Sequence, residues 1–378
     1  MESLRILELY SGIGGMHYAL KNSGISGHVV AAIDINTTAN EIYRHNFPDT
    51  PLWNRTIEGI SLDEFNKLHF DMILMSPPCQ PFTRLGHQRG IADPRTKSFL
   101  YVLNLLPRLS HLPRFILLEN VKGFESSSAR QCLIETLQKC GYTFQEVMVS
   151  PTSVGIPNSR LRYFLMAKIS KETMFLESKE SQTESSEAPL LPSPLQAVSS
   201  LTKEEEKEGH HVLYKLETAN DALRKINQNS DLSVRQIEEF LEPQEIVDMD
   251  QYLVPSKILL RYAQILDIVQ PTCRRSICFT KGYGRYVEGT GSVLQSCLET
   301  EIATVFKSLE QLSNEEKLKQ LLRLKLRYFT PREVANIMGF PKSFSFPEEI
   351  PIKQRYKVLG NSLNVVVVST LLRQLISN

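Results

Sequence analysis

A cysteine on a proline-rich segment is the residue best suited to covalent chemistry in this sequence. The segment MSPPCQPFT (Met75–Thr83) follows an apolar run, and two prolines fix the backbone directly before Cys79. A thiol on a stiff loop acts as a nucleophile when nearby donors and cations stabilise its thiolate, and Arg84 is a cation close by in sequence. For three cysteines without this context we predict inert buried side chains: Cys132, Cys140 and Cys297.

A glutamate and two arginines also stand in patterns that indicate a site. LLENVKGF (Leu117–Phe124) places Glu119 at the end of an apolar strand. A buried carboxyl is costly unless it is paired, so Glu119 is either a protonated or hydrogen-bonded ligand group or one half of a structural salt bridge. Arg160 and Arg162 stand two residues apart, which on a strand directs both side chains to one face, although both could be surface charges.

A glycine-rich turn indicates a cofactor site. LELYSGIGG (Leu7–Gly15) ends a strand and opens a helix, but His17 occupies the place of the third glycine of a dinucleotide fingerprint, which disfavours a pyrophosphate. Asp34, at the end of the next strand, is placed to accept hydrogen bonds from ribose hydroxyls. A nucleoside cofactor without pyrophosphate fits both features, and S-adenosylmethionine is such a molecule; the alternative is a plain strand-to-helix turn.

These residues lie at or near the ends of regularly spaced elements. We expect strands at 5–9, 29–33, 71–75, 115–118, 143–149 and 163–167, and helices at 16–22, 37–45, 98–109 and 129–140. Strands separated by helix-length segments predict crossover units and a largely parallel sheet covered on both faces. The fold class is therefore α/β and doubly wound, with ligands at the carboxyl edge of the sheet.

The rest of the chain changes character twice. Residues 170–209 contain nine Glu and four Lys among many Ser and Pro, which is typical of a mobile acidic linker. Beyond it we expect helices at 256–266 and 314–326, and the final apolar run 365–376 suits a buried strand or helix packed on the sheet. Between Lys257 and Thr290 six basic residues face two acidic ones, so this segment either meets phosphates or is a solvated surface.

Composition excludes several protein classes. The 378 residues contain 18 Gly, 20 Pro and 6 Cys and carry a net charge of +1, which is unlike disordered, collagen-like or disulfide-dense chains. No CxxC pair indicates a structural zinc site, so we expect no metal. No signal-like start and no run of 18 apolar residues is present, so we expect a soluble intracellular protein without a membrane contact.

The motifs resemble those of the cytosine-5 methyltransferase family in order and approximate spacing. LELYSGIGG, the Pro-Pro-Cys segment, Glu119-Asn120-Val121, Arg160-x-Arg162 and the terminal QRYKVLGNSLNV carry the likeness, which covers residues 4–168 and about 327–376. RRSICFTKGYG (Arg274–Gly284) and the absence of regulatory domains resemble the small branch of the family that methylates tRNA, best known for cytosine-38 of tRNA(Asp). One departure is Asn158, where many DNA-modifying members have Gln.

The resemblance implies a domain plan and a set of site residues. It implies a Rossmann-like catalytic domain in residues 1–169, the linker 170–209, a smaller target-recognition domain in 210–326, and a return to the catalytic domain in 327–378. It makes Cys79, Glu119, Arg160 and Arg162 catalytic. It assigns binding of S-adenosyl-L-methionine, and of the product S-adenosyl-L-homocysteine, to Ile13, Gly14, Gly15, Asp34, Ile57, Glu58, Ser76, Asn361 and Ser362. It assigns substrate contacts to Arg84, Lys122, Arg275, Phe279, Thr280 and Lys281.

The implied reaction begins with attack of the Cys79 thiolate on cytosine C6, which makes C5 nucleophilic. Protonated Glu119 donates to N3 and accepts from the exocyclic amine, while the two arginines hold O2 and the adjacent phosphate. No residue stands out as the base that removes the C5 proton, and water could serve.

The implied substrate is tRNA, because an RNA loop offers an unstacked base at low cost. DNA is an alternative substrate, since the base chemistry is identical, and a non-catalytic nucleic-acid-binding protein is a third reading. We expect a monomer in the cytoplasm, with the nucleus as a second location.

Overall fold

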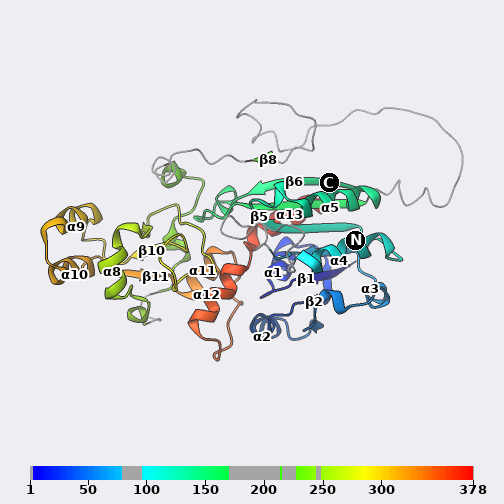
Figure 1. Cartoon of the computed structure of the whole chain (residues 1–378), viewed down its shortest axis with the longest axis horizontal. Helices are drawn as coiled ribbons and strands as arrows, with labels where there is room; N and C mark the ends of the chain where they lie inside the picture. Colours follow the sequence, from blue (N-terminus) through cyan, green and yellow to red (C-terminus); the bar gives the residue numbers. More distant parts are fainter. Residues whose placement is uncertain (1–2, 79–95, 170–212, 215–226, 244–247, 378) are drawn as a thin grey trace, which may run out of the picture.

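The structure, a computed structural model, describes residues 3–78, 96–169, 213–214, 227–243 and 248–377. Figure 1 shows a larger part built around a twisted sheet, with both chain ends on it, and a smaller part of short helices and strands beside it. The predicted linker 170–209, the nucleophile Cys79 and its neighbour Arg84 lie outside the described residues.

The large sheet has eight strands among the described residues and confirms all six predicted ones. From edge to edge they are β3 (Leu52–Trp53), β2 (Gly27–Ile33), β1 (Leu4–Leu9), β4 (Met72–Met75), β5 (Phe115–Val121), β7 (Arg162–Ile169), β6 (Tyr142–Val149) and β8 (Leu213–Tyr214). The strands pair in parallel except that β7 runs antiparallel to both β5 and β6. The chain winds outward in both directions from β1 and β4, and a crevice forms at the carboxyl ends of strands at such a reversal.

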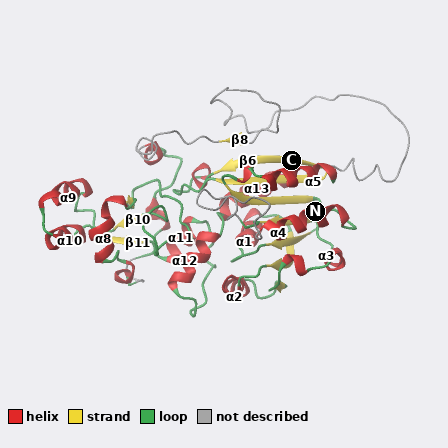
Figure 2. Ribbon diagram, in the orientation of Figure 1, coloured by secondary structure: helices red, strands yellow, loops and turns green. Residues whose placement is uncertain are grey.

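Helices cover both faces of this sheet (Figure 2). One face packs against α1 (Gly15–Ser23), α2 (Thr37–Asn46) and α13 (Val365–Ser377), and the other against α3 (Leu62–Leu68), α4 (Lys97–Leu105) and α5 (Ser128–Lys139). Successive strand residues face opposite sides, so Ile6 belongs to the first core and Leu7 to the second. Burial on both faces explains the nearly continuous apolar runs from which these strands were predicted.

The smaller part has its own sheet and core. Its strands are ordered β11 (Leu326–Tyr328), β10 (Val293–Gln295) and β9 (Ile268–Val269), and its helices are α8 (Ser256–Tyr262), α9 (Ile302–Ser308) and α10 (Asn314–Leu322). The helices predicted at 256–266 and 314–326 are confirmed as α8 and α10, but both end earlier. The predicted domain boundary at 326 falls inside β11, because residues 326–328 complete the small sheet.

The last fifty residues return to the large sheet through α11 (Pro331–Ile337), α12 (Ile352–Asn361) and α13. The structure resolves the alternative of strand or helix for residues 365–376 in favour of a helix. The Asn364 side chain caps α13 by accepting hydrogen bonds from the backbone N–H groups of Val366 and Val367, both at 3.1 Å. Short 3-10 helices complete the described chain: η1 (Ile57–Gly59), η5 (Leu106–Arg108), η6 (Phe124–Ser126), η7 (Pro151–Val154), η9 (Ile237–Phe240), η10 (Met249–Tyr252), η11 (Ala263–Ile265) and η12 (Leu309–Gln311).

One stretch of the described chain, Ile352–Ser377, has the length and hydropathy of a membrane span. It comprises α12 and α13, which are separated by a break at residues 362–364. In the window concerned, 56% of the surface is buried inside the molecule, and α13 packs on α1. This is the pattern of a helix in a protein core.

Candidate active site

A pocket of about 460 Å³ opens at the carboxyl edge of β1, β2 and β4. Seven of the nine residues that the sequence assigned to the cofactor line it: Ile13, Asp34, Ile57, Glu58, Ser76, Asn361 and Ser362. They come from the glycine-rich turn, the end of β2, η1, the end of β4 and the end of α12. The fold therefore gathers in one place residues from five separate regions of the chain.

Gly14 and Gly15 stand behind the pocket rather than on its wall, and close packing explains why both are glycines. Gly14 has a φ of +85°, and a Cβ there would lie 2.5 Å from the Phe47 ring. A Cβ on Gly15 would lie 3.0 Å from Ser362 Oγ. The two glycines thus let the turn that follows β1 approach both α2 and the C-terminal segment.

Asp34 shapes the pocket as well as lining it. Its Oδ2 accepts a hydrogen bond from Gly12 N–H and its Oδ1 from Asn36 N–H, both at 2.8 Å. Burial raises the pKa of this carboxyl, and the backbone donors act against the rise. Each carboxylate oxygen can accept more than one hydrogen bond, so Asp34 keeps acceptor capacity for a hydroxyl.

The remaining lining suits a nucleoside cofactor. Ile13, Ile57, Pro78 and Val358 offer apolar surface for a planar base, whereas Asp34 and Glu58 offer carboxylates for hydroxyl groups. The buried Ser11 hydroxyl, in the same glycine-rich turn, has no hydrogen-bond partner among the described residues. These residues fit S-adenosylmethionine in size and polarity.

Tyr10 is a pocket residue that the sequence analysis missed. Its backbone adopts a φ of +57°, its hydroxyl donates to Ser98 Oγ at 3.0 Å, and its carbonyl accepts from Ser76 Oγ at 3.3 Å. Tyr10 and Ser98 both line the pocket. The position of Tyr10 inside the glycine-rich motif was the one signal in the sequence for this role. No sequence pattern indicated that Ser98 would be its hydrogen-bond partner.

Glu119 lies at the end of β5, one strand away from the Pro-Pro segment. It is 9% exposed, and its Oε1 lies 3.4 Å from Arg162 Nε. Burial raises the pKa of Glu119, and the charges of Arg162 and Arg160 act against the rise. The carboxyl is thus both buried and beside an arginine, with its proton retained to higher pH than usual.

The next residue, Asn120, holds the Pro-Pro segment in place. Its Nδ2 donates to the Pro77 carbonyl at 3.4 Å, and its Oδ1 accepts from Val121 N–H at 2.9 Å. Asn120 is buried, and Pro78 lines the pocket. Cys79 is the next residue in the sequence after Pro78, and Cys79 and Arg84 both lie outside the described residues.

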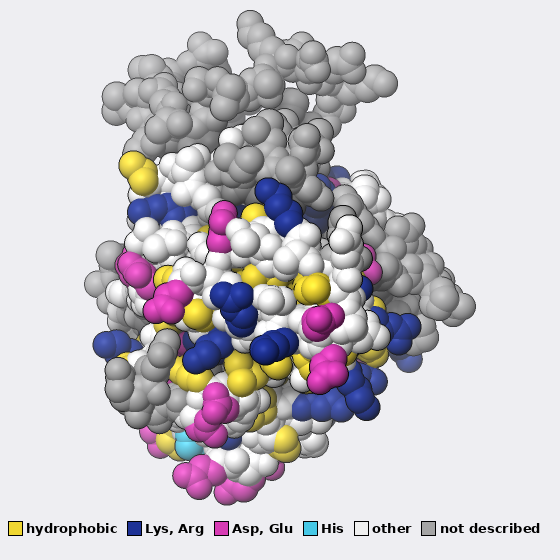
Figure 3. Space-filling view, turned by 90° about the vertical axis from the view of Figure 1, so that its left-hand side faces the viewer, with side chains coloured by type: hydrophobic (Ala, Val, Ile, Leu, Met, Phe, Trp, Pro, Cys, Tyr) yellow, Lys and Arg dark blue, Asp and Glu magenta, His cyan; other side chains and the backbone are white. Residues whose placement is uncertain are grey.

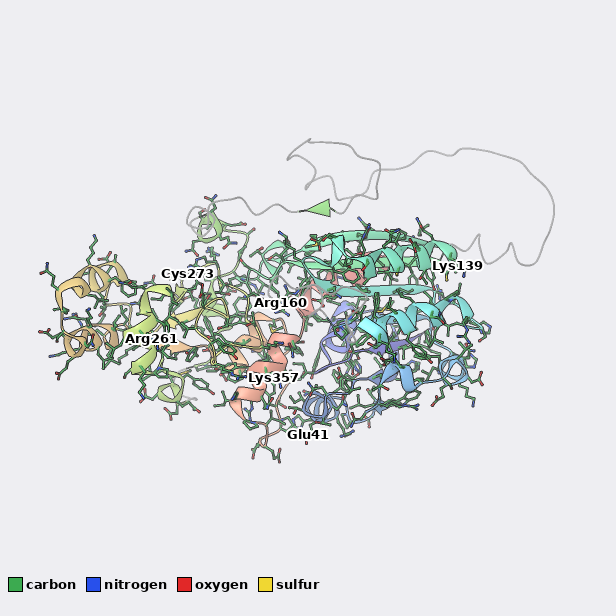
Figure 4. All side chains as sticks on the ribbon, in the orientation of Figure 1. Glu41, Lys139, Arg160, Arg261, Cys273 and Lys357 are labelled. Atoms are coloured by element: carbon green, nitrogen blue, oxygen red, sulfur yellow. The ribbon has the colours of Figure 1, made fainter. Side chains whose placement is uncertain are left out.

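Arg160 joins three segments at the junction of the two parts (Figure 4). Its Nη1 donates to Phe279 O at 3.1 Å and lies 3.4 Å from Cys278 Sγ, while its Nη2 donates to the carbonyls of Gly360 and Ser362. The expected fork on the cytosine O2 and phosphate is thus wrong for Arg160 in this structure, because backbone carbonyls occupy its terminal nitrogens.

Cys278 lies between the two arginines. Arg162 Nη2 is 3.7 Å from its Sγ. Burial raises the pKa of this thiol, but the charges of Arg160 and Arg162 outweigh that effect and leave the pKa below its ordinary value. The sequence singled out Cys278 only as part of a motif and did not predict this contact.

Two predicted substrate contacts need correction. Arg275 is 7% exposed, and its Nη1 lies 2.9 Å from both carboxylate oxygens of Asp267, so the guanidinium is already paired inside the protein. Phe279 is 2% exposed and packs edge-on against Tyr283 and Phe329. Neither side chain is available to a phosphate or a base in this structure.

The other predicted contacts keep surface access. Lys122 and Lys281 are exposed, and Thr280 is half-buried. Asn158, whose role the sequence left open, donates to Ser276 Oγ and Ile277 O, both at 3.0 Å, and so joins the large part to the smaller one. Among the described residues, no group of three His, Cys, Asp or Glu side chains could hold a metal ion.

Comparison with known proteins decides the family. Residues 4–377 match the model of the family described as C-5 cytosine-specific DNA methylase. The chain belongs to this family. The predicted family and fold class are thereby confirmed, and the protein is a methyltransferase.

Several members of this cytosine-5 methyltransferase family are similar over their whole length. The human tRNA (cytosine(38)-C(5))-methyltransferase is 55% identical, with 99% of each chain covered, and the mouse protein of that name is 56% identical, with 98% of this chain and 93% of that one covered. A crystal structure of a Spodoptera frugiperda DNMT2 mutant is 40% identical at a TM-score of 0.76, covering 99% of this chain and all of that one.

Proposed function

We propose that this protein methylates C5 of cytosine-38 in tRNA, in the anticodon loop of tRNA(Asp), with S-adenosylmethionine as methyl donor. The names of the human and mouse relatives support the position and the substrate. Their similarity extends through the smaller part, where family members differ in what they recognise, since the alignments cover nearly the whole chain.

One observation carries the proposal from the structural side. Glu119 is buried with a raised pKa against Arg162, one strand from the Pro-Pro segment and the pocket. A protonated carboxyl can donate one hydrogen bond and accept another, which matches the N3 and amine edge of cytosine. A plain structural salt bridge would instead favour a lowered pKa.

Cys79 supplies the electrons that cytosine lacks at C5. Its thiolate adds to C6, and Glu119 donates its proton towards N3 while its other oxygen accepts from the exocyclic amine, so C5 becomes nucleophilic. When bound, S-adenosylmethionine supplies the electrophilic methyl group. Loss of the C5 proton to a base then re-forms the C5–C6 double bond and releases the Cys79 thiolate.

Arg162 and Arg160 have different roles in this proposal. Arg162 orients Glu119 through its Nε and stays close to the base edge. Arg160 positions the segments around the site, because its guanidinium binds carbonyls on both sides of the junction. In the pocket, Asp34 and Glu58 would hold hydroxyl groups of the cofactor, and Ile57 and Val358 would pack on its base, since all four residues line the pocket.

DNA is the competing substrate. A Dictyostelium discoideum relative that is 38% identical over all of this chain and 95% of its own carries the name DNA (cytosine-5)-methyltransferase. The base chemistry is the same on either polymer, so the residues at the site do not separate the two.

Methyl transfer to bulk tRNA and to duplex DNA, measured side by side with radiolabelled S-adenosylmethionine, tests the proposal. We expect 5-methylcytosine in tRNA, mapped to position 38, and little label in DNA. Cys79→Ala serves as the matched control and should abolish transfer while leaving the affinity for S-adenosylhomocysteine unchanged. Equal labelling of DNA, or full activity of Cys79→Ala, would contradict the substrate or the nucleophile respectively.

A further inference from the structure

The loop formed by residues 280–290 presents an exposed aromatic ring that the reaction does not use. Tyr286 is 58% exposed, and it is the one aromatic side chain among the exposed large hydrophobic residues of the described chain. The Arg285 guanidinium lies 5.0 Å from the centre of its ring. Lys281 and Arg285 are themselves exposed. An exposed ring with one cation beside it and a second on the same loop is a combination that binds unpaired bases and their phosphates.

The loop is built to hold this ring in place. Its ends meet where Thr280 N–H donates to Thr290 O at 2.9 Å, and Thr290 Oγ1 donates to Tyr286 O at 2.8 Å. Tyr286 N–H donates to Gly282 O at 2.9 Å, and a Cβ on Gly282 would lie 3.0 Å from the edge of the Tyr286 ring. Gly282 therefore leaves the space in which that ring rests.

A second tyrosine of the same loop points the other way and anchors it. Tyr283 is 4% exposed, its hydroxyl donates to Ser292 O at 2.7 Å, and the hydroxyl accepts from Phe329 N–H at 2.9 Å. Its ring packs edge-on against Tyr356 of α12. An anchored loop can present Tyr286 without a large entropic cost on binding.

The loop also adjoins the active site. A Cβ on Gly360 would lie only 2.2 Å from Lys281 N, and the two residues after Gly360 line the cofactor pocket. Arg160 donates to carbonyls on both sides of this contact, those of Phe279 and Gly360. The start of the loop and the pocket wall are thus in direct contact.

We infer that Tyr286 is a stacking platform for an unpaired base of the substrate RNA loop, with Lys281 and Arg285 on the neighbouring phosphates. This inference rests on the proposed function, since it specifies how that RNA is held. A duplex keeps its bases stacked on one another, so the platform favours a single-stranded loop over duplex DNA.

The smaller part offers a matched control. On α8, Arg261 lies over the ring of its neighbour Tyr262 at 5.2 Å, so the same pair of residue types recurs in the same order. Figure 4 shows Arg261 well separated from Arg160. Tyr262 is half-buried, and Tyr262→Ala removes a ring of the same type away from the active site.

The test uses the full-length protein with S-adenosylhomocysteine and a tRNA anticodon stem-loop in which 2-aminopurine replaces one loop base at a time. Stacking on an aromatic ring quenches this fluorophore. We expect Tyr286→Ala to weaken RNA binding by about 5- to 150-fold and to remove quenching at one loop position, whereas Tyr286→Phe and Tyr262→Ala resemble the wild type.

Salt dependence separates the ring from the cations. Tyr286→Ala should leave the slope of log affinity against log salt unchanged, because no phosphate contact is lost, while Lys281→Ala with Arg285→Ala should flatten it. If the wild-type protein methylates RNA but Tyr286→Ala binds that RNA and quenches the fluorophore as the wild type does, this inference is wrong and the proposed function stands. Failure of the wild type to methylate RNA removes the proposed function and the inference together.

Discussion

Glu8, the second-last residue of β1, is completely buried. Its Oε2 accepts a hydrogen bond from the Tyr43 hydroxyl at 2.8 Å, and His17 Nδ1 lies 2.8 Å from the same hydroxyl. Burial raises the pKa of Glu8 to about 8 and lowers that of His17 to about 3. This network is therefore largely uncharged at neutral pH, close to a pocket that is lined by the carboxylates of Asp34 and Glu58.

The variant Glu8→Gln tests how much the buried Glu8 carboxyl lowers the free energy of unfolding when it ionises. A carboxyl that titrates near 4.5 when unfolded and near 8 when folded makes the folded state progressively less stable as pH rises between those values. The glutamine variant, which cannot ionise, should gain stability over the wild type by up to a few kcal/mol (order of magnitude) at pH 8, and the gain should shrink towards pH 5. Urea unfolding at both pH values measures it, and parallel pH profiles for the two proteins would disprove the assignment.

Asp34→Ala should weaken S-adenosylhomocysteine binding by roughly 1 to 3 kcal/mol, since hydrogen bonds to a charged acceptor are lost and Gly12 N–H loses its partner. Asp34→Asn keeps an oxygen of the same size and should fall between the wild type and the alanine variant. Isothermal titration calorimetry gives all three affinities. Identical values would mean that Asp34 serves only the turn.

At the scale of the elements, the start of α13 is fixed by the residue that precedes it, Asn364. Asn364 is buried, caps α13 and also donates to Ile337 O at 3.1 Å at the end of α11. It therefore fixes the junction of two helices as well as the start of one.

Asn364→Ala should lower the free energy of unfolding by about 2 kcal/mol, because the cap is lost and the Ile337 carbonyl is left buried without its donor. The matched control is Ser313, which caps the more exposed α10. Ser313→Ala should cost only about 1 kcal/mol or less. Denaturant unfolding of both variants compares the two, and a smaller loss for Asn364→Ala would show that α13 starts correctly without its cap.

The sequence predicted the elements of the large sheet well, because strands buried on both faces must be apolar almost throughout. It did not predict the reversed direction of β7. It also did not predict the strands β9 to β11, because strands of two or three residues are too short to show a detectable periodicity. The glycine-rich turn and Asp34 followed from motifs at strand ends, whereas Ile57, Glu58, Asn361 and Ser362 followed only from the resemblance to the family. Arg275 and Phe279 were misjudged because the pairing with Asp267 and the aromatic packing depend on contacts that no local pattern records.

At the scale of the whole molecule, the described surface at the end of the smaller part is not uniformly basic. Figure 3 views the molecule from the end of the smaller part and shows Lys and Arg side chains mixed with acidic and hydrophobic ones. Of the six basic residues noted between 257 and 290, four are exposed: Lys257, Arg261, Lys281 and Arg285. For the proposed recognition of tRNA we therefore expect particular side chains on this part to matter more than a broad positive field.

Deletion of residues 177–207 should leave activity and folding largely unchanged. The deletion removes 31 of the 43 residues between Ile169 and Leu213, and the remaining twelve can extend to about 40 Å. The partners of Ile169 and Leu213 on β6, Tyr142 and Val147, lie five residues apart, which is roughly 17 Å along a strand. In a control variant, a Gly-Ser segment of the same length replaces residues 177–207. Methyl transfer and thermal unfolding are measured for the wild type, the deletion variant and this control, and loss of soluble protein on deletion would show that the segment packs on the rest of the protein.

The packing of α13 against α1 has a consequence for biosynthesis. The ribosome makes α1 early, but 195 further residues separate the end of β7 at residue 169 from the start of α13 at residue 365. At about 5 to 20 residues per second, the nascent chain spends roughly 10 to 40 s with its sheet complete through β7 and the apolar side of α1 still uncovered. Translation that stops at the start of α13, directly after residue 365, would leave that side uncovered permanently, so such products should be bound by chaperones and degraded even though every residue of the catalytic motifs has been made.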